Sequence, residues 1–501
     1  MEPAAEADRS LSAMSSSEQS QPVPVAVAFG DGIGPAIMEA TLRILEAAKA
    51  PILPERIEIG EKVYLSGVTS GIEPGAWDVL RRTRVFLKAP ITTPQGGGYK
   101  SLNVTTRKTL GLYANVRPCR SFHPFVQSRH PGMDVTIIRE NEEDTYAGIE
   151  HQQTAEVTQC LKLISRPGCE RIVRYAFEYA KRAGRRRVTC MVKDNIMKLT
   201  DGLFRRCFEE EAARHPEIES DVMIIDIGTA RIADTPGTFD VVVLPNLYGD
   251  IVSDVVAQLT GSVGIAGSAN IGDDFAMFEA IHGSAPDIAG KGIANPSALI
   301  QGSLQMLVHL GMTAHANLIQ NAWLRTLEDG ITTGDLVNAK GERGKAGTDE
   351  FASAVIARLG DEPNTLPRAA FRGGESASFE TRRGPKRPVK TLGGVDVFLD
   401  WDEDGRDPNV LGARLRALEL ANLRLSIVTN RGVKVFPDGF PETFCTDHWR
   451  CRFTEPDGGD ITHEDVLELL ARIRKAGLDF IKTEHLCRFD GERGWSLGQG
   501  E

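Results

Sequence analysis

Two aspartates stand four residues apart in the segment NLYGDIVSDVV, at Asp250 and Asp254. If this segment is a helix, the spacing places both carboxylates on one face. Two close carboxylates repel each other unless a cation lies between them, and oxygen ligands of this kind suit Mg²⁺ or Mn²⁺. The segment therefore indicates a divalent-cation site, with two solvated surface acids as the alternative.

Three arginines occur in two stretches that also carry other hydrogen-bonding side chains. KSLNVTTRKTLGLYANVRP contains Ser101, Asn103, Arg107 and Arg117, and DVTIIRENEEDTYAGIE contains Arg139. A guanidinium group binds a carboxylate through two parallel hydrogen bonds, so three arginines around one site would bind a multiply charged anion. The alternative is a set of solvated surface arginines.

Two further segments bear on chemistry. The loop HGSAPDIAGKGIANP, residues 282–296, is rich in glycine and carries one acid, Asp287, which predicts close approach of the backbone to a polar ligand. GDGIGPAI, residues 30–37, lacks the G-x-G-x-x-G spacing of a Rossmann dinucleotide site, because its third glycine comes one position early. Lys193 ends a predicted strand, where α/β proteins often carry catalytic groups, although a lone lysine there is also common on surfaces.

Length and composition limit the class of protein. The chain has 501 residues, so several domains are expected, and its net charge of −11 argues against a general nucleic-acid binder. No apolar run approaches the roughly 20 residues that span a bilayer, so no membrane partner is expected. The eight cysteines form no CxxC pair, which favours reduced thiols in a cytoplasm. Residues 1–22 lack an apolar signal region and are expected to be a disordered tail.

Short apolar runs alternate with amphipathic stretches from Val23 onward, which predicts an α/β core with two lobes. The predicted strands are VAVAFG, RVFLKAP, DVTIIRE, RRVTCMVK, DVMIIDIG and FDVVVLP, and GPAIMEATLRILEAAK is a predicted helix. A stretch rich in Gly, Ser, Arg and Pro at 368–390 predicts a linker. The remaining residues predict the order β-α-β-β-β-α-β of a ferredoxin-like α+β domain, with Thr462 capping its second helix.

Six motifs occur together and in order: SLNVTTR, LYANVRP, IIRENEEDTYAGIE, KDNIMK, NLYGDIVSD and HGSAPDIAGKGIANP. They resemble the isocitrate/isopropylmalate (β-decarboxylating) dehydrogenase family, and SLN before the arginine resembles its isocitrate branch. GVDVF, TNRG, DHWRCRF and FDGE resemble a bacterial subtype with an extra C-terminal domain. The resemblance implies a non-Rossmann α/β fold. Its expected parts are a large cofactor-binding domain (23–112 and 261–360), a small domain with the dimer interface (113–260), a linker (361–390) and a C-terminal ferredoxin-like domain (391–501).

The same resemblance implies oxidative decarboxylation of isocitrate to 2-oxoglutarate and CO₂ in the tricarboxylic acid cycle of a bacterial cytoplasm. The implied substrate-binding residues are Ser101, Asn103, Arg107, Arg117 and Arg139. Mg²⁺ or Mn²⁺ would be held by Asp250 and Asp254 of one subunit and Asp226 of another, in a homodimer or tetramer with shared active sites. Lys193 from the second subunit, with Asp226, would deprotonate the hydroxyl group, and Tyr146 would protonate the enolate.

The resemblance also implies the cofactor site. It places Thr93 and Glu279 near a nicotinamide, and the 282–296 loop around an adenosine. The loop residues expected to contact the cofactor are His282, Gly283, Ser284, Ala285, Asp287, Ile288 and Asn295. Members of the family that use NADP carry Lys and Tyr where this chain has Asp287 and Ile288, and an aspartate would repel a 2′-phosphate but accept a hydrogen bond from a free ribose hydroxyl. We therefore predict NAD, unless another basic residue such as Lys291 binds the phosphate.

Other functions remain open from the sequence. The chain could be an NADP-preferring isocitrate dehydrogenase, or a homoisocitrate or 3-isopropylmalate dehydrogenase, against which Ser101 and Asn103 argue. The C-terminal domain is expected to brace the oligomer, and the alternative is a regulatory module that senses a small ligand. That domain also holds a weak zinc-like pattern without the spacing of a standard finger: Cys445, His448, Cys451, His485 and Cys487.

Overall fold

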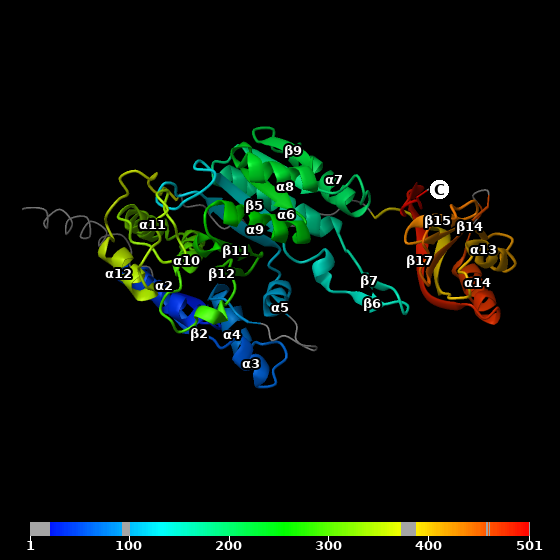
Figure 1. Cartoon of the computed structure of the whole chain (residues 1–501), viewed down its shortest axis with the longest axis horizontal. Helices are drawn as coiled ribbons and strands as arrows, with labels where there is room; N and C mark the ends of the chain where they lie inside the picture. The colour runs from blue at the N-terminus through cyan, green and yellow to red at the C-terminus, as the bar shows by residue number, and fades with distance from the viewer. Residues whose placement is uncertain (1–20, 93–100, 372–386, 457–458, 460, 500–501) are drawn as a thin grey trace, which may run out of the picture. The chain divides into compact units, whose positions relative to one another are not determined.

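The computed structural model describes residues 21–92, 101–371, 387–456, 459 and 461–499, which form two compact units (Figure 1). The first unit contains the described residues up to Tyr146, then Ile164–Asn195, and the described residues that follow Thr200 as far as 371. The second unit contains Ala147–Leu163, Ile196–Thr200 and the described residues from 387 onward. Two short pieces from the middle of the chain therefore belong with the C-terminal region.

A ten-stranded sheet runs through the described part of the first unit, in the order β2-β1-β3-β12-β11-β4-β5-β10-β8-β9. Its strands are β1 (Val23–Ala28), β2 (Ile52–Arg56), β3 (Val85–Lys88), β4 (Ala114–Arg120), β5 (Asp134–Glu140), β8 (Arg187–Val192), β9 (Glu219–Ile224), β10 (Val241–Leu244), β11 (Gly267–Ile271) and β12 (Ala276–Ala280). Strand β4 pairs antiparallel with both β5 and β11, and β11 pairs antiparallel with β12. The other pairs are parallel, so an antiparallel centre joins two parallel halves.

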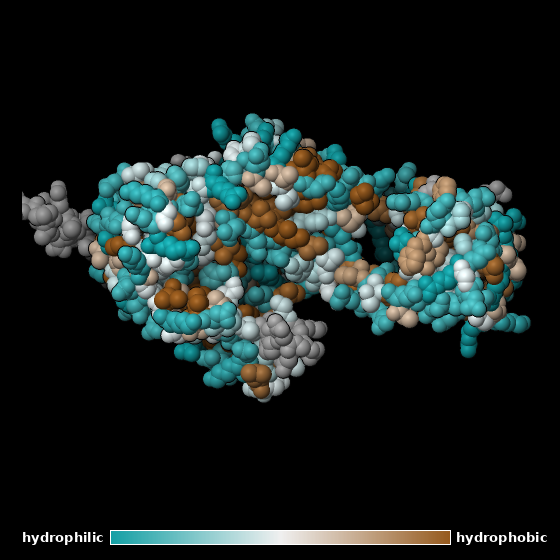
Figure 2. Space-filling model, in the orientation of Figure 1, coloured by the Kyte–Doolittle hydropathy of each residue, from teal (hydrophilic) through white to brown (hydrophobic). Residues whose placement is uncertain are grey.

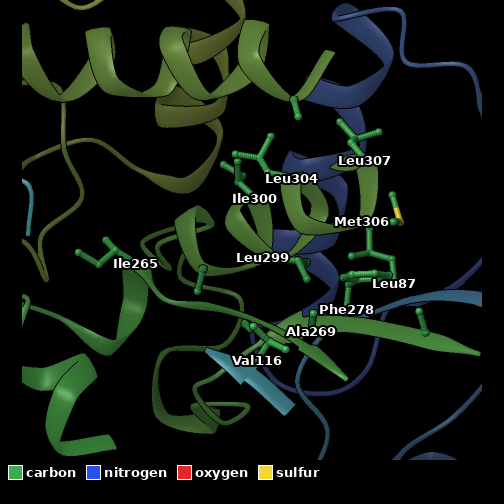
Figure 3. Packing of buried hydrophobic residues seen from close by; sticks show 14 of the residues in the cluster. Leu87, Val116, Ile265, Ala269, Phe278, Leu299, Ile300, Leu304, Met306 and Leu307 are labelled. Atoms are coloured by element: carbon green, nitrogen blue, oxygen red, sulfur yellow. The ribbon is translucent and has the colours of Figure 1, made fainter. Parts of the chain in front are cut away.

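Helices surround this sheet: α2 (Gly34–Ala47), α3 (Glu61–Leu65), α4 (Pro74–Thr83), α5 (Leu102–Thr109), α6 (Arg166–Arg182), α7 (Thr200–Ala212), α8 (Ile225–Asp234), α9 (Asn246–Leu259), α10 (Ser297–His309), α11 (Thr313–Glu328) and α12 (Thr348–Ala357). Helices α2, α4 and α6 each have a proline in the first turn, where the missing N–H leaves no bond unmade. The largest hydrophobic core lies where α10 packs on the central strands (Figure 3). Leu299 and Leu304 of α10 and Phe278 of β12 are among its fully buried members.

The second unit has its own core and an antiparallel sheet in the order β15-β14-β16-β13-β17-β18. Its elements are β13 (Lys390–Asp400), α13 (Pro408–Arg416), β14 (Arg424–Asn430), β15 (Val433–Phe436), β16 (His448–Thr454), α14 (His463–Lys475), β17 (Asp479–Phe489) and β18 (Glu492–Arg493). Strands β14-β16-β13-β17 and the two helices have the ferredoxin-like order, to which β15 adds an edge strand. A separate hairpin of β6 (Glu150–Gln152) and β7 (Thr158–Cys160) belongs to the same unit.

The predicted fold class, an α/β core with a C-terminal ferredoxin-like α+β domain, is confirmed. Thr462 caps α14 as predicted, because its hydroxyl oxygen accepts the Asp465 N–H at 3.2 Å. The predicted strand DVMIIDIG is wrong in its second half, since β9 ends at Ile224 and α8 begins at Ile225. The predicted tail lies outside the described residues up to position 20, and most of the predicted linker does so at 372–386.

The zinc-like pattern does not form a site among the residues that the structure describes, where no cluster of metal-binding side chains occurs. Cys451 belongs to the hydrophobic core, whereas His448, three positions away on the same strand, packs against the ring of Phe398. Successive strand residues alternate between faces, so these two side chains point in opposite directions. Within the described chain, no helix has the length and apolar content that crossing a bilayer requires.

Replacing Leu304 with alanine should lower the free energy of unfolding by about 2–5 kcal/mol, because it leaves a cavity in the core of the first unit. Leu304 is 1% exposed, and Leu65, which is 68% exposed, provides the control for the same substitution. Urea titration followed by circular dichroism measures both. Equal stability of Leu304→Ala and Leu65→Ala would contradict this packing.

Candidate active site

A cavity of about 250 Å³ opens in the first unit beside the carboxyl ends of β3, β5 and β12. In parallel α/β sheets this edge is where ligands usually bind. The cavity collects most of the side chains that the sequence predicted to act together: Ser101, Asn103, Arg107, Arg117, Arg139, Tyr146, Asp250, Glu279, His282 and Gly283. Lys88 completes a lining of four cationic side chains and two carboxylates among the described residues.

Glu279 lies at the centre of this charge arrangement. Its carboxylate is 2.8 Å from Lys88 Nζ and 3.1 Å from Arg107, and all three side chains are buried. Asn270 on β11 donates a third bond at 2.8 Å. Burial alone would raise the pKa of Glu279, but the charges of Lys88 and Arg107 hold that pKa well below its usual range. Glu279 is therefore a permanent anion that lets two cations remain buried.

Arg117 and Arg139 reach the cavity from the adjacent antiparallel strands β4 and β5. Arg117 donates to Asn115 at 2.7 Å, to Ser253 at 2.6 Å and to Asp254 at 3.1 Å. Arg139 is 1% exposed. Burial, and then the charges of the other arginines, lower the pKa of Arg117 and bring that of Arg139 to about 10. These groups are crowded by like charge, and an added anion would relieve that crowding.

Arg139 also fixes the side chains on α9. Its guanidinium group donates to Asn246 at 3.0 and 2.8 Å and forms a short ion pair with Asp250. The Tyr146 hydroxyl donates to the other oxygen of Asp250 at 2.7 Å. Burial and this hydrogen bond raise the pKa of Tyr146, whose ring also lies under the Arg139 guanidinium. Tyr146 is thus held in its protonated form at the edge of the cavity.

The donor set on α9 fits a divalent cation. Asp250 and Asp254 are one helical turn apart, as predicted, and both face arginine side chains. Asp254 accepts one bond from Arg117 but is mostly exposed, so part of its carboxylate is open to an added ion. Carboxylate oxygens without sulfur or nitrogen donors suit Mg²⁺ or Mn²⁺. Two carboxylates fill only part of the coordination shell of such an ion, so further ligands would come from other groups.

Three buried polar atoms of cavity residues make no hydrogen bond to any described residue: Asn103 Oδ1, Arg107 Nε and His282 Nε2. Buried polar atoms normally have a partner, because an unmade bond costs about 1–3 kcal/mol. Burial also lowers the pKa of His282, so its ring is neutral. These atoms indicate that the cavity is completed by a polar ligand.

Lys193 and Asp226 do not line the cavity. Lys193 Nζ lies 3.0 Å from the Asp226 carboxylate, and this hydrogen bond holds the pKa of Asp226 below its usual value. Asp226 is 68% exposed at the start of α8, and the backbone N–H of Lys193 is held by Asp201 at 2.7 Å. The two residues predicted to act from a second subunit therefore form an exposed pair within one chain.

The glycine-rich segment at 30–34 supports the predicted cofactor loop and is more than a tight turn. A β-carbon at Gly32, where φ is +58°, would lie 2.1 Å from the carbonyl oxygen of Ser284. The Ile33 N–H donates to that oxygen at 2.9 Å, and the hydroxyls of Thr92 and Ser284 are 2.6 Å apart. Ala285 follows in a left-handed conformation with φ of 39°, a strained state that is common beside ligand sites. Thr93 lies outside the described residues.

The rest of the cofactor loop runs along the surface. Asp287 is exposed in a short 3₁₀ turn (Pro286–Ile288), and Asn295 is buried and donates to Asp335 at 3.0 Å. The Thr348 N–H and hydroxyl donate to the carbonyl oxygens of Gly292 and Ala294 at 2.8 and 2.7 Å. The segment before Thr348 carries Lys340, Arg343 and Lys345, all exposed. Thr348 therefore ties the chain just after these basic residues to the loop that holds Asp287.

The sequence did not indicate the asparagine and serine side chains that hold the arginines in place. Asn115 bridges Ser268 and Asn270 at 2.8 and 2.9 Å, and Asn246 holds Arg139. Ser268 and Asn270 stand two positions apart on one strand, so their shared face could have been predicted from period-two spacing. Asn115 and Asn246 carry no such local signal.

Comparison with known proteins identifies the family. Residues 24–355 match the isocitrate/isopropylmalate dehydrogenase family, and residues 390–501 match the bacterial isocitrate dehydrogenase C-terminal domain. The isocitrate dehydrogenase (NADP) of Rickettsia felis is 52% identical over 480 residues, covering 95% of this chain and 99% of the relative. That of Thermus thermophilus is 43% identical over 485 residues, covering 95% and 96%. A Thermus thermophilus crystal structure matches with a TM-score of 0.89 at 43% identity, again covering 95% and 96%.

The chain therefore belongs to the isocitrate/isopropylmalate dehydrogenase family and carries the C-terminal domain of bacterial isocitrate dehydrogenases. The names of these relatives contradict the prediction of NAD from Asp287, which is wrong. That prediction rested on the charge of one exposed side chain. It took no account of the basic residues at 340–345, which lie far away in sequence but only a few positions before Thr348, the residue that is hydrogen-bonded to the same loop.

Replacing Glu279 with glutamine should destabilise the protein at neutral pH by about 3–5 kcal/mol, because Lys88 and Arg107 would lose their buried counter-charge. The pKa of Glu279 is depressed in the folded state, so its stabilising effect is complete above the unfolded pKa of about 4.3 and declines as the pH falls below it. Urea titrations from pH 7 to pH 3 should show a constant difference from wild type above about pH 5 that narrows in acid. A difference that grows in acid would contradict this role.

Proposed function

We propose that this chain catalyses the oxidative decarboxylation of isocitrate to 2-oxoglutarate and CO₂, with NADP as hydride acceptor, in the tricarboxylic acid cycle of a bacterial cytoplasm. The observation that carries the proposal is the cavity in which Arg107, Arg117 and Arg139 converge beside the carboxylates of Asp250 and Asp254. Isocitrate has three carboxylates and one hydroxyl group, and this arrangement complements both its charge and its metal-binding oxygens.

The positions of these residues support the substrate-binding roles that we propose. Arg107, Arg117 and Arg139 bind the carboxylates of the substrate. The negative charge of the substrate reduces the repulsion among the three guanidinium groups. Ser101 and Asn103, at the start of α5, donate hydrogen bonds to the distal carboxylate of the substrate. A substrate with an apolar group at that place would leave these two donors without a partner. This is the feature that favours isocitrate over 3-isopropylmalate.

Asp250 and Asp254, with Asp226 of a second subunit, would hold a Mg²⁺ or Mn²⁺ ion. When bound, such an ion acts as a Lewis acid toward the substrate hydroxyl oxygen. Lys193, oriented by Asp226, accepts the hydroxyl proton. Glu279 would help to hold the nicotinamide of NADP, which when bound would supply the acceptor for the hydride of C2. The β-keto acid then loses CO₂, and Tyr146 donates its phenolic proton to C3 of the enolate. The raised pKa of Tyr146 supports that role, because the group stays protonated until the enolate forms.

NADP is supported by the names of the relatives and by the basic segment beside the cofactor loop. Asp287 does not itself bind the 2′-phosphate. Lys291, which lies four residues beyond it, and Lys345 are both exposed close to the backbone contact between the two segments. Two lysines can bind the phosphate and outweigh the single charge of Asp287.

We also propose a homo-oligomer in which two copies pair through α8 and α9. Ile227 on α8 is 51% exposed and Ile251 on α9 is 54% exposed. Figure 2 shows hydrophobic surface over the region that carries these helices. Exposed apolar patches of this kind mark protein interfaces. Pairing at α8 would also bring Asp226, and with it Lys193, toward the cavity of the other copy.

Initial rates test the activity. With isocitrate and Mg²⁺, kcat/KM should be higher with NADP than with NAD, and homoisocitrate and 3-isopropylmalate should turn over more slowly. Replacing both Lys291 and Lys345 with glutamine should raise the KM for NADP by roughly tenfold, because two charge-assisted contacts to the phosphate are lost. The same change at exposed Lys62 is the control. A preference for NAD would refute the cofactor proposal, and no turnover with any of the three acids would favour a binding protein.

Mixing two inactive variants tests the shared site. Lys193→Met and Tyr146→Phe should each be inactive as homodimers, because every site lacks one catalytic group. If Lys193 acts in the partner's cavity, dimers re-formed from an equal mixture contain one intact site in each hybrid, which gives roughly a quarter of wild-type activity. Activity measured after dissociation and reassociation provides the readout. No recovery, with hybrid dimers confirmed by mass, would place Lys193 and Tyr146 in the same copy's site.

A further inference from the structure

A row of polar side chains crosses the centre of the ten-stranded sheet on the face opposite the largest hydrophobic core. Leu87, Val116, Ala269 and Phe278, from β3, β4, β11 and β12, belong to that core (Figure 3). Side chains alternate along a strand, so the residues next to these four point to the opposite face. Those residues include six that are all buried: Lys88, Asn115, Arg117, Ser268, Asn270 and Glu279.

Four members of this row form a continuous chain of hydrogen bonds. Arg117 Nε donates to Asn115 Oδ1 at 2.7 Å, and Asn115 Nδ2 donates to Asn270 Oδ1 at 2.9 Å. Asn270 Nδ2 then donates to Glu279 Oε1 at 2.8 Å. Asn115 and Asn270 occupy paired positions on β4 and β11, so strand register brings the two amides together. We call Asn115 and Asn270 the amide bridge.

The two ends of the chain force the orientation of both amides. A guanidinium group only donates hydrogen bonds, and an ionised carboxylate only accepts them. Arg117 therefore requires the oxygen of Asn115, and Glu279 requires the nitrogen of Asn270. In the middle, the oxygen of Asn270 accepts from Asn115 and also from Asn141 Nδ2, at 3.1 Å. Reversing either amide of the bridge would bring two donors or two acceptors together.

The amide bridge fixes one edge of the Arg117 guanidinium group. Asn115 holds Nε, and Ser253 and Asp254 hold Nη1 at 2.6 and 3.1 Å. Nη2 lies 3.8 Å from the Asp250 carboxylate, beyond the range of a hydrogen bond, and Arg117 lines the cavity. Because a guanidinium group is planar, bonds at Nε and Nη1 set the direction of the N–H groups on Nη2.

We propose that Asn115 and Asn270 are positioning residues for substrate binding: Glu279 sets the direction of the two amides, and the amides hold Arg117 in the orientation in which Nη2 binds a substrate carboxylate. This inference rests on the proposed function, in which Arg117 binds a carboxylate of isocitrate. Asn115 and Asn270 lie behind the residues that line the cavity, so they act through Arg117.

The first test removes the contact to Arg117. In a full-length Asn115→Ala variant the KM for isocitrate should rise about tenfold, because Arg117 loses a hydrogen bond that fixes its orientation. The value of kcat should stay within about twofold of wild type, because the lost interaction is made in the ground state and the transition state alike. Asn321→Ala is the matched control and should leave both constants unchanged. Asn321 is a buried asparagine on α11 that accepts the Ala369 N–H at 2.8 Å.

A double-variant cycle tests whether the two asparagines act in series. Asn270→Ala should also raise the KM for isocitrate, because Asn115 loses the partner that fixes its direction. The double variant Asn115→Ala with Asn270→Ala should have the same KM as Asn115→Ala alone. Residues that act through one contact are not additive, whereas independent losses of structure add in free energy.

Asn270→Asp tests the direction of the bridge and keeps the size of the side chain, so it also serves if the alanine variants do not fold. When protonated, the new side chain can accept from Asn115 and donate to Glu279, as asparagine does. When ionised, it places a second carboxylate against Glu279, and two close carboxylates repel. The ratio of its KM for isocitrate to that of wild type should therefore rise roughly tenfold between about pH 6 and pH 9.

Three kinetic results would overturn the inference. An unchanged KM in Asn115→Ala would mean that Arg117 does not need the bridge. A KM increase in the double variant equal to the product of the two single increases would mean that the asparagines act independently. A ratio for Asn270→Asp that does not change with pH would mean that the direction of the bridge has no effect.

The orientation of Arg117 can also be measured without turnover. A crystal structure of the unliganded Asn115→Ala variant should show the Arg117 guanidinium group rotated from its wild-type plane, and an unmoved group would overturn the inference. A wild-type protein that fails to oxidise isocitrate would refute the proposed function instead. The crystal structure would then still decide whether the amide bridge holds Arg117.

Discussion

The buried carboxylate of Glu279 is the constraint on which the active-site cavity depends. Four cationic side chains converge there, and cations in an interior repel one another and lose their hydration. Glu279 balances Lys88 and Arg107, while Asp250 and Asp254 balance Arg139 and Arg117 from α9. The lining still carries more positive than negative groups, so the cavity attracts an added anion.

The antiparallel centre of the sheet makes this balance possible. Strands β3, β12, β11, β4 and β5 are neighbours in the sheet although they come from distant parts of the chain. Lys88 and Glu279 occupy paired positions on β3 and β12, and Asn115 of β4 bonds Ser268 and Asn270 of β11. Strand register, which is rigid, thus sets four of the charged groups, Lys88, Arg117, Arg139 and Glu279. Arg107 comes from α5, and α9 adds two carboxylates at helical spacing. Rigid supports of this kind keep repelling groups close together.

The second unit links two features that the sequence separates by about half the chain. A polar hairpin inserted after Tyr146 joins the ferredoxin-like domain, because Arg406 and Asp447 supply partners for Glu156 and Thr154.

The cofactor loop also contacts a segment that is distant in the sequence. Asp287 alone indicated NAD, but Thr348, which closely follows the basic residues at 340–345 and lies more than 50 residues away, is hydrogen-bonded to the same loop.

The sequence by itself determined the element types, the order of the ferredoxin-like domain, the family motifs and most of the residues around the cavity. Hydrophobic period and capping are local, so strands such as β5 and the Thr462 cap could be predicted. Only the tertiary structure decided which charges neutralise each other, that α8 begins at Ile225, that Lys193 pairs with Asp226 outside the cavity, and that the 150–160 hairpin belongs with the C-terminal domain. These depend on strand register and long-range packing, which no local pattern records.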